Sequence, residues 1–161
     1  MIVVADTSVI LNLCRVRHDF LLQRLFKRVL VPREVAQEFA RLTKVHKRFS
    51  GLILPEWIEV LPAPGSFPDE VVQAELDAGE AAAIALSLEQ KADALLIDEA
   101  LGRRVARKLG IPTIGIIRVL IQARDKNLIP SMTTLLDRLE DEANFWISED
   151  LRLEALKLVG E

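Results

Sequence analysis

Short runs of consecutive apolar residues alternate along this chain with longer stretches in which apolar residues recur every three or four positions. The short runs are typical of strands buried on both faces and cover residues 2–5, 29–31, 57–61, 94–97 and 113–114. The longer stretches predict helices from about residue 8 and at residues 18–26, 32–42, 79–86, 99–109, 116–126, 131–143 and 149–159. Because strands and helices alternate, we expect an α/β fold, a three-layer α/β/α sandwich with a central, mostly parallel sheet.

Residues that start or stop elements support these boundaries. Pro32 suits the first turn of a helix, Asp77 can cap the next one, and Gly110 can end a third. Residues 62–68 are rich in proline and predict a loop, but this segment is too short for a domain linker. We therefore expect one domain over residues 1–161, with residues 128–161 as a C-terminal helical extension that packs on the domain or on a second copy.

Composition narrows the class of protein. Of 161 residues, 50% are hydrophobic and 28% are charged, as in a folded globular domain. The apolar runs are too short to cross a bilayer, no basic segment of a signal peptide opens the chain, and the lone Cys14 excludes a disulfide framework and a cysteine-based zinc site. We expect a cytoplasmic protein that does not enter a membrane. The net charge of −3 argues only weakly against a nucleic-acid partner, since metal-binding acids would add to it.

Two aspartates directly follow predicted strands. Asp6 comes after residues 2–5, and Asp98 comes after residues 94–97. Both would project at the carboxyl edge of a parallel sheet, where ligands bind in such folds. The alternative is that each aspartate only caps the helix that comes after it.

Two glutamates lie on predicted helices. Glu38 borders the apolar stripe that holds Val35 and Phe39, where it could instead pair with Arg41. Glu80 begins an alanine-rich helix, where an acid would also compensate the helix dipole.

Together the two aspartates and two glutamates could form one cluster of oxygen ligands. Crowded carboxylates repel one another and need a cation if all are to stay ionised. Hard oxygen ligands suit magnesium or manganese, and such ions activate water and stabilise the charge of a reacting phosphate. The cluster therefore indicates hydrolase chemistry.

Four segments resemble the ordered motifs of the PIN-domain family. Residues 3–8 (VVADTS) resemble the opening motif, and residues 31–38 (VPREVAQE) the second, a proline-started helix whose acid is Glu38. Residues 77–84 (DAGEAAAI) and 95–99 (LLIDE) resemble the third and fourth. The likeness spans residues 1 to about 120, and its specificity lies in the order and spacing of the motifs. It is closest to a prokaryotic, toxin-like and largely uncharacterised branch that ends in a Phe-Trp segment, as this chain does at residues 145–146.

The resemblance implies a metal-dependent endoribonuclease with magnesium or manganese as cofactor. It implies that the catalytic residues and metal ligands are Asp6, Glu38, Glu80 and Asp98, with Ser8 as a supporting hydroxyl. Because many relatives are toxins of toxin–antitoxin pairs, it also implies single-stranded or structured RNA as substrate, a small antitoxin protein as partner, and a homodimer.

The chain departs from the family pattern at two places. Many relatives have aspartate where this chain has Glu80, which changes the reach of that ligand. Many also carry a further aspartate shortly after the fourth motif, whereas here Glu99 directly follows Asp98. Glu99 could support the site in its place or act as a first-turn helix acid, and we favour the helix acid.

Basic residues follow the last motif, and two of them share each face of a helix. These are Arg103 and Arg107 on one face and Arg104 and Lys108 on the other. They form either a solvated surface or contacts to RNA phosphates. The same alternatives apply to a second patch of Lys44, His46, Lys47 and Arg48. The aromatic residues are expected to be core or dimer contacts, and they are Trp57, Phe145 and Trp146.

Other classes fit the residues less well. A haloacid-type phosphatase would place a second aspartate where this chain has Ser8, and a receiver domain would need paired acids in the first loop. A P-loop or dinucleotide fold would need a glycine fingerprint after the first strand. The remaining alternative is a catalytically inactive α/β module that keeps its acids as caps and binds a protein partner or RNA.

Overall fold

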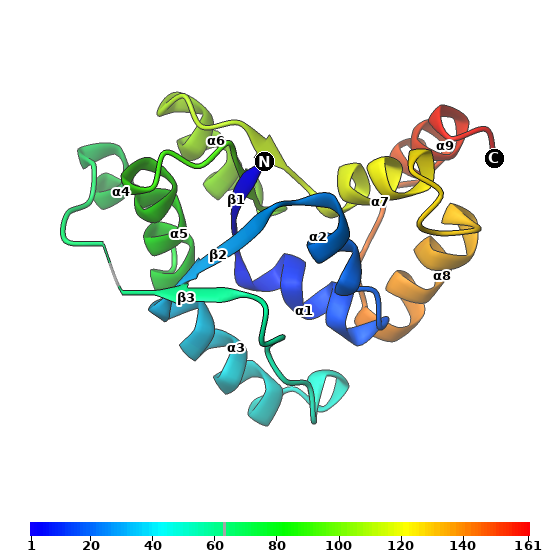
Figure 1. Cartoon of the computed structure of the whole chain (residues 1–161), viewed down its shortest axis with the longest axis horizontal. Helices are drawn as coiled ribbons and strands as arrows, with labels where there is room; N and C mark the ends of the chain where they lie inside the picture. The colour runs from blue at the N-terminus through cyan, green and yellow to red at the C-terminus, as the bar shows by residue number, and fades with distance from the viewer. Residues whose placement is uncertain (63) are drawn as a thin grey trace.

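In the computed structural model, which describes residues 1–62 and 64–161, a parallel sheet of five strands forms the centre of the molecule (Figure 1). The strand order is β3-β2-β1-β4-β5. The strands are β1 (Ile2–Ala5), β2 (Arg28–Pro32), β3 (Glu59–Leu61), β4 (Ala94–Leu96) and β5 (Thr113–Ile114). Every neighbouring pair is parallel, so the predicted α/β class is confirmed.

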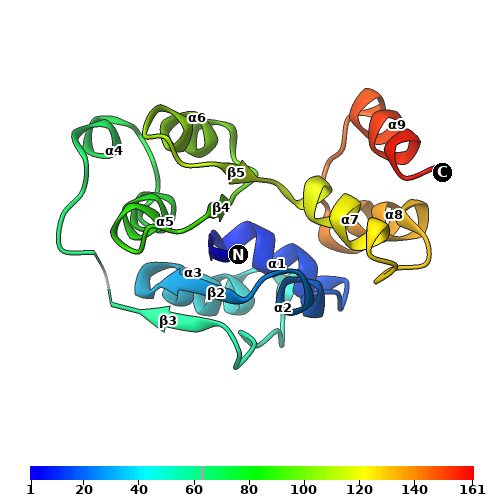
Figure 2. The same ribbon diagram turned by 45° about the horizontal axis from the view of Figure 1, so that its top comes forward.

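The central strand β1 is buried because it pairs on both sides. Val3 lies opposite Val29 of β2 and Ala94 of β4, and Val3 and Val4 have no exposed surface. A strand without a polar face must have helices on both sides of the sheet. In Figure 2, α5 and α6 lie on one side of the strands and α1 and α2 on the other.

The helices follow the predicted order. They are α1 (Thr7–Arg15), α2 (Phe20–Leu25), α3 (Arg33–Val45), α4 (Asp69–Gln73), α5 (Ala78–Glu89), α6 (Ala100–Lys108), α7 (Ile116–Asp125), α8 (Met132–Ala143) and α9 (Glu149–Leu158). Asp77 caps α5 as predicted, because its Oδ1 accepts a hydrogen bond of 2.7 Å from the backbone N–H of Glu80. Gly110 follows α6 with a φ of 77°, which favours glycine.

Several boundaries differ from the prediction. Pro32 ends β2 in an extended conformation and occupies the N-cap position of α3, so it precedes the first helical turn. The helix α4 and a single 3-10 turn at Lys47–Phe49 were not predicted, because segments this short show no apolar periodicity. Of the predicted loop at residues 62–68, Ala63 lies outside the described residues.

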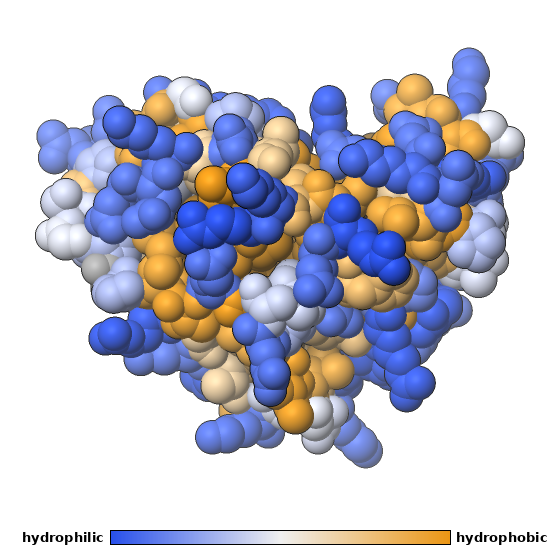
Figure 3. Space-filling view, viewed as in Figure 1, coloured by the Kyte–Doolittle hydropathy of each residue, from blue (hydrophilic) through white to orange (hydrophobic). Residues whose placement is uncertain are grey.

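The C-terminal helices α7, α8 and α9 gather at one end of the molecule (Figure 1). Helix α8 buries Leu135, Leu136 and Leu139 and contacts α1. Helix α9 exposes the apolar side chains of Leu151, Leu153 and Leu158, which are 43%, 58% and 65% exposed. Figure 3 shows apolar surface over this helix. Within residues 1–62 and 64–161 no helix has the length and apolarity that a membrane span requires.

The carboxylate of Glu161 fastens the start of α8. It accepts hydrogen bonds from the backbone N–H groups of Met132 (2.8 Å) and Thr133 (3.1 Å) and forms an ion pair with Arg124. These hydrogen bonds lower the pKa of Glu161 to about 2, and the one from the Met132 N–H has the largest effect.

We expect Glu161→Ala to lower the free energy of unfolding by about 1 kcal/mol, the effect of losing a helix cap. For a chain of this size the melting temperature should fall by roughly 2–4 °C. Because the pKa of Glu161 is lowered in the folded protein, its carboxylate stabilises the fold at pH values above the ordinary glutamate pKa. This stabilisation is lost as the pH falls toward 2. Thermal melts of both proteins at pH 7 and pH 3 test this, and an equal difference at both values would contradict it.

Candidate functional site

An acidic pocket of about 430 Å³ opens at the carboxyl edge of the sheet. Three of the four predicted metal ligands line it, and so does the predicted supporting residue Ser8. Each ligand comes from a different element: Asp6 follows β1, Glu38 lies on α3, and Glu80 lies in the first turn of α5. Parallel pairing brings these distant parts of the chain to one edge.

Asp6 does not act as a helix cap. It precedes α1, yet its side chain makes no capping hydrogen bond. The residue is only 4% exposed, and its Oδ1 is buried without a hydrogen-bond partner among the described residues. Burial, together with the nearby charges of Asp77, Glu38 and Asp98, raises the pKa of Asp6 to about 7. A buried carboxylate oxygen without a partner is costly, so the cap interpretation does not explain this residue.

Glu38 is held where α3 approaches α5. A Cβ added to Gly79 would lie 3.0 Å from Oε2 of Glu38, so only a residue without a side chain leaves that oxygen in place. Burial, followed by the charge of Asp77, raises the pKa of Glu38. The alternative of a simple edge residue paired with Arg41 is not supported, because no ion pair joins the two in the described part of the chain.

Glu80 is buried at the start of α5, with 9% of its surface exposed. Its Oε2 lies 3.9 Å from the position that a Cβ on Gly102 of α6 would occupy. Burial raises the pKa of Glu80, and the charges of Asp77 and Asp6 add to the effect. Glu80 is therefore more than a first-turn acid facing solvent.

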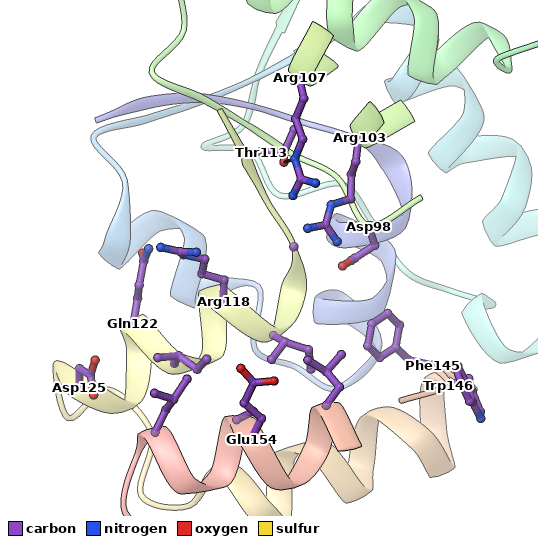
Figure 4. A pocket seen from close by; sticks show the side chains of 16 residues that line it. Asp98, Arg103, Arg107, Thr113, Arg118, Gln122, Asp125, Phe145, Trp146 and Glu154 are labelled. Atoms are coloured by element: carbon purple, nitrogen blue, oxygen red, sulfur yellow. Dashed lines mark hydrogen bonds between the residues drawn. The ribbon is translucent and has the colours of Figure 1, made fainter. Parts of the chain in front are cut away.

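Asp98 lies beside the acidic pocket and does not line it. Its Oδ1 accepts a hydrogen bond of 3.0 Å from the backbone N–H of Ile116, at the start of α7, while Oδ2 is buried without a partner among the described residues. It lines cavities on the side of Arg103 (Figure 4). Burial raises the pKa of Asp98, and its charge reaches Asp6.

The side chains of the acidic pocket carry the oxygen ligands that a hard divalent cation prefers, but they are not arranged around one ion position. Within residues 1–62 and 64–161, no three carboxylate, histidine or cysteine groups converge as ligands of one ion. The donors are nevertheless carboxylate oxygens, which such ions prefer, and the buried Oδ1 of Asp6 lacks the partner that an ion would supply. Asp6, Glu38 and Glu80 are the residues that would hold it.

Two residues in the acidic pocket were not predicted as part of the site. Asp77 lines it while also capping α5, and its position two residues before Gly79 and three before Glu80 is the signal that could have indicated it. Asn12 lines the pocket from α1 and is 9% exposed. A lone amide within the apolar run of residues 9–14 is the corresponding signal in the sequence.

The predicted basic residues divide between neighbouring surfaces. His46 and Arg48, of the second patch, line the acidic pocket. Arg103 and Arg107 line two cavities together with Asp98. Arg104 and Lys108 line only the second of these cavities. Glu99 caps α6, because its Oε2 accepts a hydrogen bond of 3.1 Å from the N–H of Gly102. It is therefore the residue before the first turn of α6 and not the first-turn acid that we favoured from the sequence, and it also lines the acidic pocket.

The three aromatic residues differ in their surroundings. Trp57 and Phe145 are partly buried against the core. Trp146 is 83% exposed, so a core contact is excluded for it, and the alternative of a dimer contact stays a prediction. Both Phe145 and Trp146 line the acidic pocket and also the larger cavity beyond it. They therefore stand at the boundary between the two.

Comparison with known proteins gives a family and a fold. The profile of the family DUF3368, described as a PIN domain, matches residues 2–161. The structure is similar to that of a PilT N-terminus domain protein from the hyperthermophilic archaeon Sulfolobus solfataricus P2, with a TM-score of 0.56 and 17% identity over 76% of this chain and 93% of that one. No curated protein matches the sequence. At that identity the structural likeness shows the fold alone.

Proposed function

The chain belongs to the PIN-domain family, and on this premise we propose that it is an endoribonuclease that hydrolyses RNA with the help of magnesium or manganese. PIN domains are generally metal-dependent nucleases, which supports a hydrolase. The observation that carries the proposal is the buried Oδ1 of Asp6, which has no hydrogen-bond partner in the described part of the chain and lies in a pocket shared with Glu38 and Glu80.

Each acid has a distinct task in this proposal. Asp6, Glu38 and Glu80 would hold the ion, and Asp98, fixed by the N–H of Ile116, would add negative charge from the side. When bound, such an ion lowers the pKa of a water molecule and offsets charge on the phosphate. Asp77 keeps the first turn of α5 in place through its hydrogen bond to Glu80.

RNA is proposed as the substrate because cations flank the acids. Arg48 lines the same pocket, and Arg103 lies next to Asp98. Arginine side chains position a phosphate backbone without reading its sequence. A role as the toxin of a toxin–antitoxin pair, an antitoxin partner and a homodimer stay predictions from the resemblance.

The direct test is cleavage of labelled single-stranded RNA by the purified chain with Mg²⁺ or Mn²⁺, with a chelator as the first control. Glu80→Gln should lose the activity. Glu89→Gln should keep it, because Glu89 is exposed at the other end of the same helix. Equal cleavage by both variants would mean that the activity does not depend on Glu80 and comes from a contaminant, and no cleavage by the wild-type chain would favour the inactive binding module.

We expect Gly115→Ala to reduce cleavage on the order of tenfold to a hundredfold, the usual effect of disturbing a charged group that lies beside the metal ligands. The added Cβ would lie 2.6 Å from Oδ1 of Asp98 and must displace that carboxylate. The backbone at Gly115 (φ −90°, ψ 173°) suits alanine, so the fold should persist.

Gly65→Ala is the matched control, since a Cβ there meets no atom of the described residues within 4 Å. Cleavage rates and thermal melts of both variants check the prediction. A rate equal to that of Gly65→Ala would mean that the position of Asp98 does not matter for the reaction.

A further inference from the structure

A cavity of about 700 Å³ lies next to the acidic pocket, between the α6–β5 side of the sheet and helices α7 and α9 (Figure 4). Its volume is within the range of roughly 300–1,000 Å³ that small-molecule sites occupy. The two spaces share Phe145 and Trp146, and Asp98 lines the cavity from the sheet edge. A chain of nucleotides held at the acids would therefore reach this cavity directly.

Arginine side chains line one side of the cavity. Arg103 and Arg107 come from α6 and Arg118 from α7, as Figure 4 shows. No ion pair joins any of them to an acid within the described residues. The Nε of Arg103 is buried and has no hydrogen-bond partner in residues 1–62 and 64–161, whereas the Nε of Arg107 donates to Oγ1 of Thr113 at 3.3 Å. Unpaired guanidinium groups of this kind bind phosphate.

The other walls are apolar or accept hydrogen bonds. Ile117, Ile121 and Leu158 supply apolar surface. Glu154 rises from α9 into the cavity, and Asp125 lies at its far end (Figure 4). Cations at one side with apolar and acceptor groups at the other match a nucleotide, which has an anionic phosphate and a flat base that carries N–H donors.

We propose that this cavity binds one nucleotide of single-stranded RNA beside the bond that is cut, which rests on the proposed ribonuclease function. Arg107 and Arg118 hold its phosphate, and the base stacks at the rim formed by Phe145 and Trp146. Aromatic side chains at such positions bind bases of unpaired strands, and this explains why Trp146 is 83% exposed next to both spaces. Duplex RNA, whose bases are already stacked, does not fit.

The test measures binding of a labelled single-stranded oligoribonucleotide to the full chain carrying Asp6→Asn, so that RNA is not cut. Adding Arg107→Ala and Arg118→Ala to this variant should weaken binding at least tenfold. It should also reduce the slope of log affinity against log salt by about 0.7, the value for the one phosphate that the two arginines hold. The matched control is Arg24→Ala with Lys27→Ala, two exposed cations near the amino edge of the sheet. These should leave affinity unchanged.

The stacking part has its own pair of variants. Trp146→Ala should weaken binding on the order of tenfold, and Trp146→Phe should restore most of it, because the ring remains. Arginine variants that bind as the control does, or equal binding by the two Trp146 variants, would overturn the proposal, as would a preference for duplex RNA. Because cleavage is not the readout, these results are separate from failure of the wild-type chain to cut RNA.

Discussion

Asp6→Asn is expected to reduce metal-dependent cleavage of RNA roughly a thousandfold, the effect of losing about 4 kcal/mol of transition-state stabilisation. The same change should stabilise the metal-stripped protein at pH 8. Burial raises the pKa of Asp6 from 3.8 to about 7. The folded protein therefore keeps the proton of this carboxyl more tightly than the unfolded chain does. The resulting stabilisation of the fold is complete below pH 3.8 and is lost as the pH rises through 7. Asparagine does not ionise, and the variant should gain on the order of a few kcal/mol at pH 8.

Rates from single-turnover cleavage and unfolding free energies from denaturant titrations check both parts. Asp141→Asn on α8 is the control, because Asp141 is exposed and does not line the acidic pocket. A less stable Asp6→Asn protein at pH 8, with a stability gap that does not close near pH 4, would show that the aspartate is structural.

Adding Mg²⁺ or Mn²⁺ to the stripped wild-type chain should raise its melting temperature by about 5–10 °C at pH 8. At a hundredfold excess over the dissociation constant, ligand binding contributes about 2.7 kcal/mol, and each kcal/mol shifts a chain of this size by roughly 2–4 °C. At pH 5 the shift should shrink, because protons occupy the raised-pKa acids Asp6 and Glu80 and compete with the ion.

Glu80→Gln should lose most of this shift, and Glu89→Gln should retain it. Differential scanning calorimetry at both pH values measures the effect. An increase of the same size in all three proteins would place the ion elsewhere on the surface and contradict a site in the acidic pocket.

Much of the fold could be predicted because apolar runs buried on both faces leave a clear pattern. The predicted strands 2–5 and 113–114 coincide with β1 and β5. The pattern is weaker where few residues are buried. Helix α4 buries only Val71, so no periodicity marks it.

The site could be predicted only in part. Asp6 stood out because it follows a predicted strand at the carboxyl edge of the sheet, and Glu80 stood out because it begins an alanine-rich helix. The structure places both residues in the acidic pocket with Glu38. Asp77 was missed because its capping role already explained it. The orientation of the Asp98 carboxylate depends on its hydrogen bond from the backbone N–H of Ile116. The two residues are 18 positions apart in the chain, so no local sequence pattern could indicate this contact.

The most direct measurement is the anomalous difference map of crystals grown with Mn²⁺. We predict a peak in the acidic pocket within roughly 2.0–2.4 Å of Oδ1 of Asp6, with carboxylate oxygens of Glu38 and Glu80 turned toward the same ion. An empty pocket at saturating Mn²⁺, or a peak bound only by acids outside it, would contradict the account.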